Sequence, residues 1–245
     1  MQGATTASQI LRWSAISIET LILGRSIYGR FFSKYMLFYI YIAAVLTASV
    51  SEFIVFTFFP AYIVRFYWNE QIITLAVGCG VILEIIRHVL SPHPGPERFA
   101  IWVSMLGVIF LIFGIHSYVE QKWIAAVNTA DLERQLRVVQ ALALGVVLFI
   151  IFYYRVVIGR NLRGMILGYG LYVAVSLISL TFRLSFGDQF NSIWVIVQPS
   201  SYVFALFIWM VALWSYEPNP ASGPVGLREG DYRSLVQRMR DTLKD

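Results

Sequence analysis

The feature that most constrains this chain is a series of long apolar stretches, each about as long as a bilayer-crossing helix. A span needs about 20 mostly apolar residues, because the hydrocarbon core is about 30 Å thick. Seven stretches are candidates: 10–27, 35–58, 71–90, 99–119, 138–158, 165–182 and 190–214. Backbone groups in lipid must be hydrogen-bonded within the segment, so each stretch is predicted to be a helix.

The composition supports this interpretation. Hydrophobic residues make up 58% of the chain and charged residues only 13%, whereas a soluble domain is about half apolar and a quarter charged. So few charges cannot solvate the whole surface, so much of it must face lipid. The sequence therefore predicts an all-α, polytopic membrane bundle over residues 1–215, followed by a tail over residues 216–245.

The distribution of basic residues predicts the orientation. Thirteen of the 19 lysines and arginines lie after the first, third and fifth stretches or in the tail: Arg25, Arg30, Lys34, Arg87, Arg98, Arg155, Arg160, Arg163, Arg228, Arg233, Arg238, Arg240 and Lys244. The other side holds Arg12, Arg65, Lys122, Arg134, Arg137 and Arg183. The positive-inside rule then predicts an outer N-terminus and a cytoplasmic C-terminus in the cell membrane. If the first stretch did not insert, six spans would leave both ends inside.

The tail begins with a Pro- and Gly-rich linker at 216–226, and residues 229–245 can form one short helix. Leu235, Val236, Met239 and Leu243 fall on one face of that helix. We expect this face to dock a protein partner.

A weak internal repeat appears when the chain is shifted by 130 residues, which places Gly29 and Arg30 on Gly159 and Arg160. One interpretation is a parallel duplication of three helices on each side of a central one, as in some transporters. The other is a shared charge signal and a shared apolar composition, and we favour this second interpretation.

Three glutamates lie within the apolar stretches: Glu19, Glu52 and Glu84. A charge at the bilayer centre costs about 2.5–3.5 kcal/mol on insertion scales, so such residues are candidates for function. Glu84 precedes Arg87 and His88 by three and four residues, so we expect a local ion pair on one helical face. These residues remain candidates for a ligand or proton site.

Glu19 and Glu52 lack an immediate basic neighbour. Glu19 requires a partner from another helix or protonation. Glu52 lies among Thr47, Ser49 and Ser51, where a protonated carboxyl bonded to hydroxyls is one interpretation. A site for a polar ligand or a proton is the other, and the sequence leaves both open.

Gln198 and Pro199 lie together in the last apolar stretch. A proline inside a helix frees a backbone carbonyl and can kink the helix. Gln198 is therefore a candidate ligand contact and Pro199 a candidate hinge, although a purely structural kink is the commoner outcome.

Catalytic and metal-binding signatures are missing from the sequence. There is no HExxH motif, no GxSxG motif and only one cysteine, Cys79. No apolar stretch contains a lysine that could form a retinal Schiff base. We therefore predict no catalytic residue, no metal and no cofactor, and we attribute the net charge of +5 to topology rather than to nucleic-acid binding.

The segments 67–70 (YWNE) and 84–90 (EIIRHVL) resemble a family of uncharacterised bacterial seven-helix membrane proteins. That resemblance implies the same helical fold over most of the chain and no known activity. The topology is also similar to that of SWEET-type sugar transporters, but the prolines that those proteins carry in helices one, two, five and six are absent here.

Together these features predict a non-catalytic integral membrane protein, a ligand-sensing or accessory component that acts through a partner. The alternative is a small-solute or proton-coupled transporter that uses Glu19 and Glu52. An enzyme that acts on lipid has the least support. Expected partners are the bilayer, a small polar ligand and a protein at the tail.

Overall fold

The computed structural model describes residues 6–90, 126–153 and 156–217 of the chain, and every regular element in these ranges is helical. The long helices are α1 (Thr6–Tyr28), α2 (Met36–Phe58), α3 (Ile63–Leu90), α5 (Ala126–Tyr153), α6 (Arg160–Phe186) and α7 (Asp188–Ala212). Short 3₁₀ turns, η1 (Phe32–Lys34) and η2 (Pro60–Tyr62), flank α2. The predicted all-α fold is confirmed.

Five of the described helices are long and apolar enough to cross a bilayer. Their spans are Met36–Phe58, Ile73–Leu90, Glu133–Tyr153, Arg160–Phe186 and Ile193–Ala212. The chain is therefore a multi-pass membrane protein. Helix α1 is not among the five because Arg12, Glu19 and Arg25 interrupt it, and the expected span 99–119 lies outside the described residues. Seven spans and the orientation of the termini stay predictions.

Helix α5 shows how the bundle meets lipid. Phe152 is 87% exposed and Phe149 66% exposed, whereas Arg137 on the same helix is only 2% exposed. A soluble protein has the opposite arrangement, with its large apolar side chains mostly buried. Apolar side chains outside and polar ones inside are what a hydrocarbon solvent favours.

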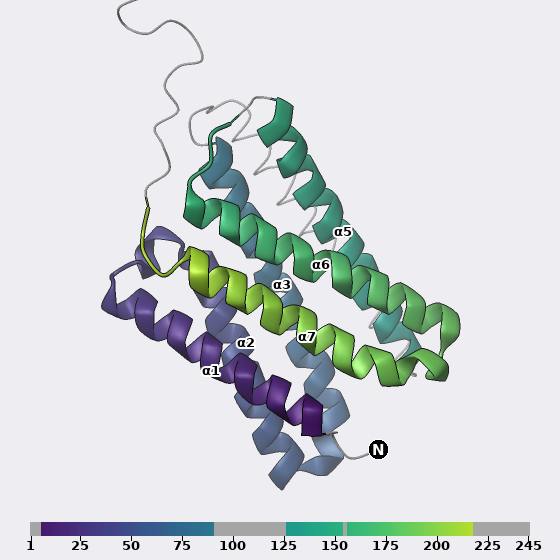
Figure 1. Ribbon diagram of the computed structural model, residues 1–245. Helices are drawn as coiled ribbons and strands as arrows, with labels where there is room; N and C mark the ends of the chain where they lie inside the picture. Colours follow the sequence, from purple (N-terminus) through teal and green to yellow (C-terminus); the bar gives the residue numbers. More distant parts are fainter. Residues whose placement is uncertain (1–5, 91–125, 154–155, 218–245) are drawn as a thin grey trace, which may run out of the picture.

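The six long helices form a closed ring, in which each contacts the next and α1 packs against α7 (Figure 1). Helix α1 turns one face inward, with Ala15, Glu19, Ile22 and Ser26 all buried at helical spacing. In the centre, the indole of Trp209 meets the rings of Phe38 and Tyr41 edge-on, at 5.1 and 6.2 Å between centroids.

Among the described helices, α6 and α7 form the most extensive contact, and α6 carries Gly164 and Gly168 in a G-x-x-x-G pattern. A Cβ atom built on Gly164 would lie 2.1 Å from the Cβ of Ala212. One built on Gly168 would lie 2.4 Å from the Nε1 of Trp209. Small residues let membrane helices approach closely, and here they fix the packing of α6 on α7.

The helix boundaries do not follow the 130-residue shift. It would carry Tyr28, the end of α1, to position 158 and Met36, the start of α2, to position 166. Helix α5 instead ends at Tyr153 and α6 begins at Arg160. The correspondence is thus out of register by about one and a half turns, which agrees with a shared composition rather than a duplication.

Gly164→Ala is expected to destabilise the protein by about 1–3 kcal/mol, because the added methyl overpacks the contact with Ala212. Gly145→Ala on α5 is the matched control, since nothing lies within 4 Å of its added Cβ. Thermal unfolding of both purified variants in the same detergent measures the effect. Equal midpoints for the two variants would contradict the proposed close contact.

Candidate functional site: a polar network inside the bundle

The inner face of α5 carries Glu133, Arg137 and Gln140, which are 6%, 2% and 1% exposed. Their spacing of four and three residues places them on one side of the helix. The sequence prediction began this helix at residue 138 and assigned Arg137 to the outer connection. That assignment is wrong, because α5 begins at Ala126 and carries Arg137 into the interior.

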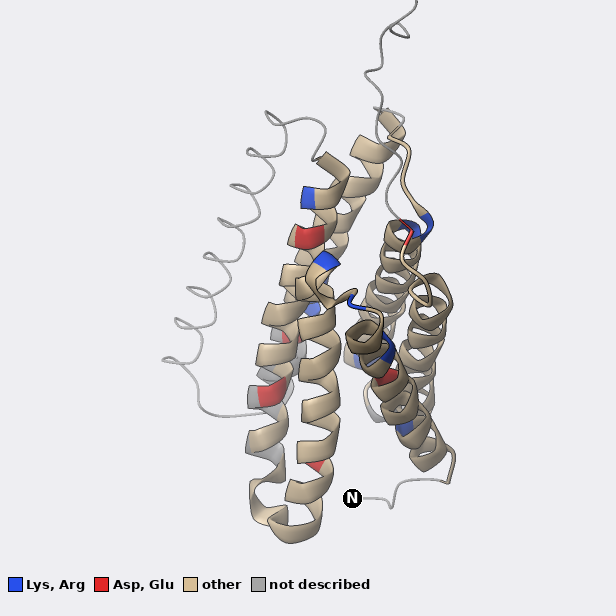
Figure 2. Ribbon diagram, turned by 90° about the vertical axis from the view of Figure 1, so that its left-hand side faces the viewer, with Lys and Arg blue, Asp and Glu red and all other residues tan. Residues whose placement is uncertain are grey.

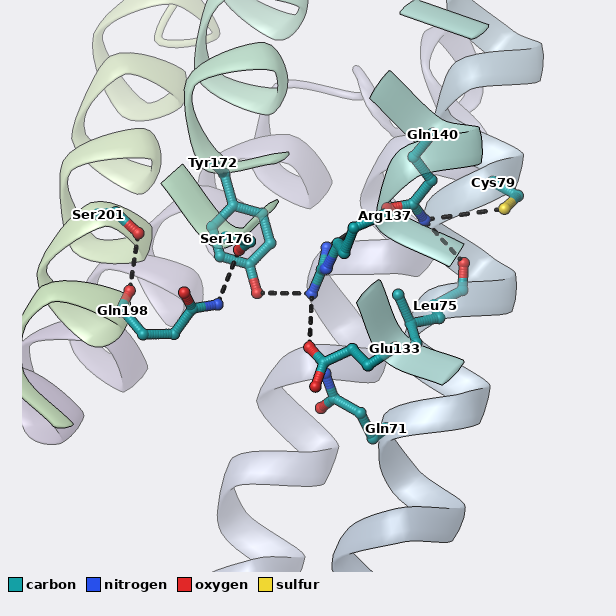
Figure 3. A network of polar contacts seen from close by, with 10 residues as sticks. All are labelled: Gln71, Leu75, Cys79, Glu133, Arg137, Gln140, Tyr172, Ser176, Gln198 and Ser201. Atoms are coloured by element: carbon teal, nitrogen blue, oxygen red, sulfur yellow. Dashed lines mark hydrogen bonds and ion pairs between the residues drawn. The ribbon is translucent and has the colours of Figure 1, made fainter. Parts of the chain in front are cut away.

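Arg137 lies at the centre of the network (Figure 3). Its Nη2 donates to the hydroxyl of Tyr172 at 3.1 Å and lies 3.7 Å from Oε1 of Glu133. Its Nη1 donates to Oε1 of Gln140 at 3.4 Å. The guanidinium carbon also lies 4.8 Å from the centre of the Tyr172 ring, within reach of a cation–π interaction.

Helix α3 completes one side of the network. Gln71 Nε2 donates to Oε1 of Glu133 at 2.8 Å. Gln140 Nε2 lies 3.2 Å from the carbonyl oxygen of Leu75 and 3.7 Å from the sulfur of Cys79. The polar face of α5 is thus joined to both a backbone carbonyl and a side-chain amide of α3.

On the other side the network extends towards α7 and α1. The rings of Tyr172 and Tyr202 pack with their centroids 5.2 Å apart. The hydroxyl of Tyr202 donates to Oε1 of Glu19 at 2.7 Å, and Glu19 is fully buried. Glu19 therefore obtains its partner from another helix, as its sequence spacing requires.

Gln198 also joins two helices, since its Nε2 donates to the hydroxyl of Ser176 at 2.7 Å (Figure 3). Helix α7 continues without a break through Pro199. The hydroxyl of Ser201 donates to the carbonyl oxygen of Gln198 at 2.8 Å. A hinge at Pro199 stays a prediction.

The network lies near the middle of the bundle. Asn161 at the start of α6 bonds to the carbonyl of Ala212 at the end of α7, so these residues mark one end. Tyr172 is eleven residues further along α6, about 16 Å away at the rise of an α-helix. Tyr172 is therefore close to the middle of the 27-residue helix α6. Tyr202, ten residues before Ala212, lies at a similar depth.

Several polar atoms of this interior have no hydrogen-bond partner among the described residues. They are Oε2 of Glu19, Nε of Arg137, the hydroxyl of Tyr169 and Oε1 of Gln198. Buried polar groups are normally satisfied by protein or by water. Bound water or another polar molecule would satisfy such unpaired atoms, and four of them lie in the same interior as a buried cation.

Glu52 belongs to a different cluster. Its Oε1 lies 3.4 Å from Nη2 of Arg12, and both side chains are partly exposed. The hydroxyl of Thr47 bonds to the carbonyl of Ala43 instead, and no hydroxyl contact to Glu52 is seen among the described residues. Glu70 precedes the apolar part of α3, and burial, assisted by the charge of Glu52, raises the pKa of Glu70 to about 7.

Glu19 and Glu52 thus have separate partners: Tyr202 of α7 for one and Arg12 of α1 for the other. No contact among the described residues joins these two glutamates. A site built on this pair has no geometric support, and the network around Arg137 takes its place as the candidate site.

Glu84 is held by the start of α2. Its carboxylate accepts hydrogen bonds from the backbone N–H groups of Phe38 at 2.8 Å and Leu37 at 3.2 Å. The first N–H groups of a helix have no partner within it, and the helix dipole favours a negative charge there. Among the described side chains, Glu84 and Arg87 form no ion pair, and Arg87 is exposed. A local pair of Glu84 with His88 stays a prediction.

A second set of contacts fixes the chain where it leaves α7. Asn161 is 1% exposed, and its Nδ2 donates to the carbonyls of Ala212 and Ser215, each at 2.8 Å. Its Oδ1 accepts the backbone N–H of Glu217 at 2.6 Å. Arg25 Nε donates to the carbonyl of Trp214 at 2.9 Å. We call residues 213–217 with these partners the exit clamp.

Basic residues gather at the same end as the exit clamp. They come from the last turns of α1 and α3, from η1 and from the first turn of α6: Arg25, Arg87, Lys34, Arg160 and Arg163. Figure 2 shows several of the blue segments towards the end of the helices away from the N label. This asymmetry agrees with the charge distribution that the sequence shows.

The remaining predictions concern the docking face in the tail and metal binding. The docking candidates Leu235, Val236, Met239 and Leu243 lie outside the described residues. Within the described ranges, no group of three or more His, Cys, Asp or Glu side chains is placed to hold a metal ion.

Sequence reasoning missed the centre of the network, although a signal was present. Glu133, Arg137, Gln140, Leu144 and Val147 recur at intervals of four and three residues. That period marks a single helical face. The search for uninterrupted apolar residues excluded its polar half and so placed Arg137 in a connection.

No protein-family model, no curated protein and no solved structure matches this chain. Its function therefore has to be inferred from its own geometry.

Glu84→Ala is expected to destabilise the protein by about 1–3 kcal/mol, because it leaves the first N–H groups of α2 without an acceptor. Arg87→Ala, one turn further along the same helix, is the control and should change stability by less than about 0.5 kcal/mol. Thermal unfolding midpoints compare the two. Equal losses would instead indicate the local ion pair between these residues.

Proposed function

We propose that this protein is a non-catalytic membrane component that binds a small polar ligand in the interior network around Arg137. The incompletely bonded guanidinium of Arg137 at mid-depth is the observation that carries this proposal. Ionisable side chains within a membrane bundle commonly mark ligand or ion sites, because they are too costly to retain without use.

The exit clamp favours a sensing or accessory role over simple binding. Helices α6 and α7 both contribute to the network, through Tyr172 and Tyr202. Both also reach the clamp, α6 with Asn161 in its first turn and α7 with its last residue, Ala212. A ligand that shifts these helices would also shift the start of the tail. The tail then presents the result to a protein partner, with Leu235, Val236, Met239 and Leu243 as its docking face.

A small-solute or proton-coupled transporter is the second candidate. The depth of Tyr172 and Tyr202 favours it, because substrate and ion sites of secondary transporters lie near the bilayer midplane. In this reading the solute binds at Arg137 rather than between Glu19 and Glu52.

The proposed orientation places the exit clamp in the cytoplasm of a cell with the protein in its inner or plasma membrane. The basic residues at that end support it through the positive-inside rule. With α1 and 99–119 inserted, the bundle would have seven spans.

A ligand present at 100 times its dissociation constant is expected to stabilise the folded chain by about 2.7 kcal/mol. This stabilisation should appear as a higher unfolding midpoint of the full chain in lipid nanodiscs. The panel comprises small carboxylates, amino acids, sugars and polyols. Arg137→Gln should remove the response. Arg183→Gln is the matched control, because Arg183 packs over Trp194 instead, 4.2 Å from its ring centre.

The same panel separates the two candidates when flux into proteoliposomes is measured. Binding without flux supports a sensing or accessory role, whereas substrate-dependent flux supports a transporter. If no solute stabilises the wild-type protein, the proposed ligand site is wrong.

A further inference from the structure

The bonding of Arg137 is incomplete in a way that suits one class of ligand. A guanidinium has five N–H donors in a planar fork. The described residues provide two hydrogen bonds, to Tyr172 and Gln140, and leave Nε without an acceptor. The Glu133 carboxylate approaches only Nη2 of Arg137, at 3.7 Å, rather than forming a bidentate ion pair. A carboxylate that faced the fork squarely would be bound more strongly.

Charge balance decides how such a carboxylate could enter. Arg137 and Glu133 are buried at 2% and 6% exposure, and together they are neutral. An isolated charge in a low-dielectric interior is strongly unfavourable. An anion bound to Arg137 would leave Glu133 as an uncompensated negative charge, unless Glu133 takes up a proton at the same time.

The other titratable side chains around the pair do not supply this compensation. From α2 comes Tyr41, from α3 come Tyr67 and Cys79, and from α6 come Tyr169 and Tyr172. These are phenols and a thiol, which are neutral at physiological pH. Beyond them lie Glu52 and Arg183, which face Tyr67, and Glu19, which faces Tyr41.

Glu133 has the contacts to remain in place when it is neutral. Gln71 Nε2 donates to its Oε1 at 2.8 Å, and a protonated carboxyl can still accept that bond. Arg137 and Glu133 are both deeply buried, so a small ligand would displace fewer packed side chains than a large one.

We infer that the ligand is a small monovalent carboxylate that binds the fork of Arg137, while Glu133 takes up one proton from solution. The inference rests on the proposed ligand site and specifies its chemistry. The one bond formed is the O–H bond of Glu133, with its proton taken from a solution acid, which becomes its conjugate base. The exchange conserves the charge of the interior: the ligand brings one negative charge and the proton removes one.

The first test uses the wild-type full chain in nanodiscs with sodium acetate and sodium formate as probes. Titration calorimetry in buffers of different ionisation enthalpy should show one proton taken up for each anion bound. Affinity for acetate should fall about tenfold for each pH unit between pH 6 and 8, because one proton is linked to binding. Binding without proton uptake overturns the inference.

The second test uses Glu133→Gln, which resembles the protonated side chain. It should bind acetate at least about tenfold more tightly than the wild type at pH 7.5, with no proton uptake and no pH dependence. Glu52→Gln is the control and should behave as the wild type, because Glu52 pairs with Arg12. Weaker binding by Glu133→Gln overturns the inference, since a merely structural role for Glu133 predicts a loss.

The outcomes separate this inference from the proposed function. If a neutral solute such as glycerol or urea stabilises the wild-type protein through Arg137 and the anions do not, the carboxylate inference fails and the ligand site stands. If no solute of any class binds, both fail.

Discussion

A hydrocarbon solvent that offers no hydrogen bonds is the constraint on which this structure depends. A polar side chain on a spanning helix is stabilised by partners inside the bundle or by a carbonyl of its own helix, because lipid offers none. Helix α5 meets this requirement by turning Glu133, Arg137 and Gln140 inward and leaving Phe149 and Phe152 outside. The ring of helices is closed around these polar groups, and its aromatic centre of Phe38, Tyr41 and Trp209 separates them from the clamped end.

The apolar stretches predict the helices well, because length and hydrophobicity are local properties of the chain. They do not predict partners. Glu84 bonds to backbone groups 46 and 47 residues away, and Glu19 bonds to a tyrosine 183 residues away. Backbone N–H groups at the start of a helix leave no mark in a sequence, so the spacing indicated only the nearby Arg87 and His88 as partners of Glu84.

Polar residues at the end of an apolar stretch are where sequence reasoning is weakest. Residue 138 begins the apolar run of α5, yet the helix begins twelve residues earlier, and its Glu133 and Arg137 are buried. Gln71 and Gln140 offset the cost of burying these polar side chains, since each supplies an amide that bonds across the α3–α5 contact. Glu133 and Arg137 of the candidate site therefore lie just before the first residue of the predicted apolar stretch.

The packing of α6 on α7 explains how an interior ligand could act at a distance. Gly164 and Gly168 bring the two helices so close that neither can slide without displacing Ala212 or Trp209. Packed elements of this kind have discrete arrangements rather than a continuum. A change of contacts at Tyr172 would then move α6 and α7 together. Asn161 bonds to both the end of α7 and the segment beyond it, so the exit clamp would follow that movement.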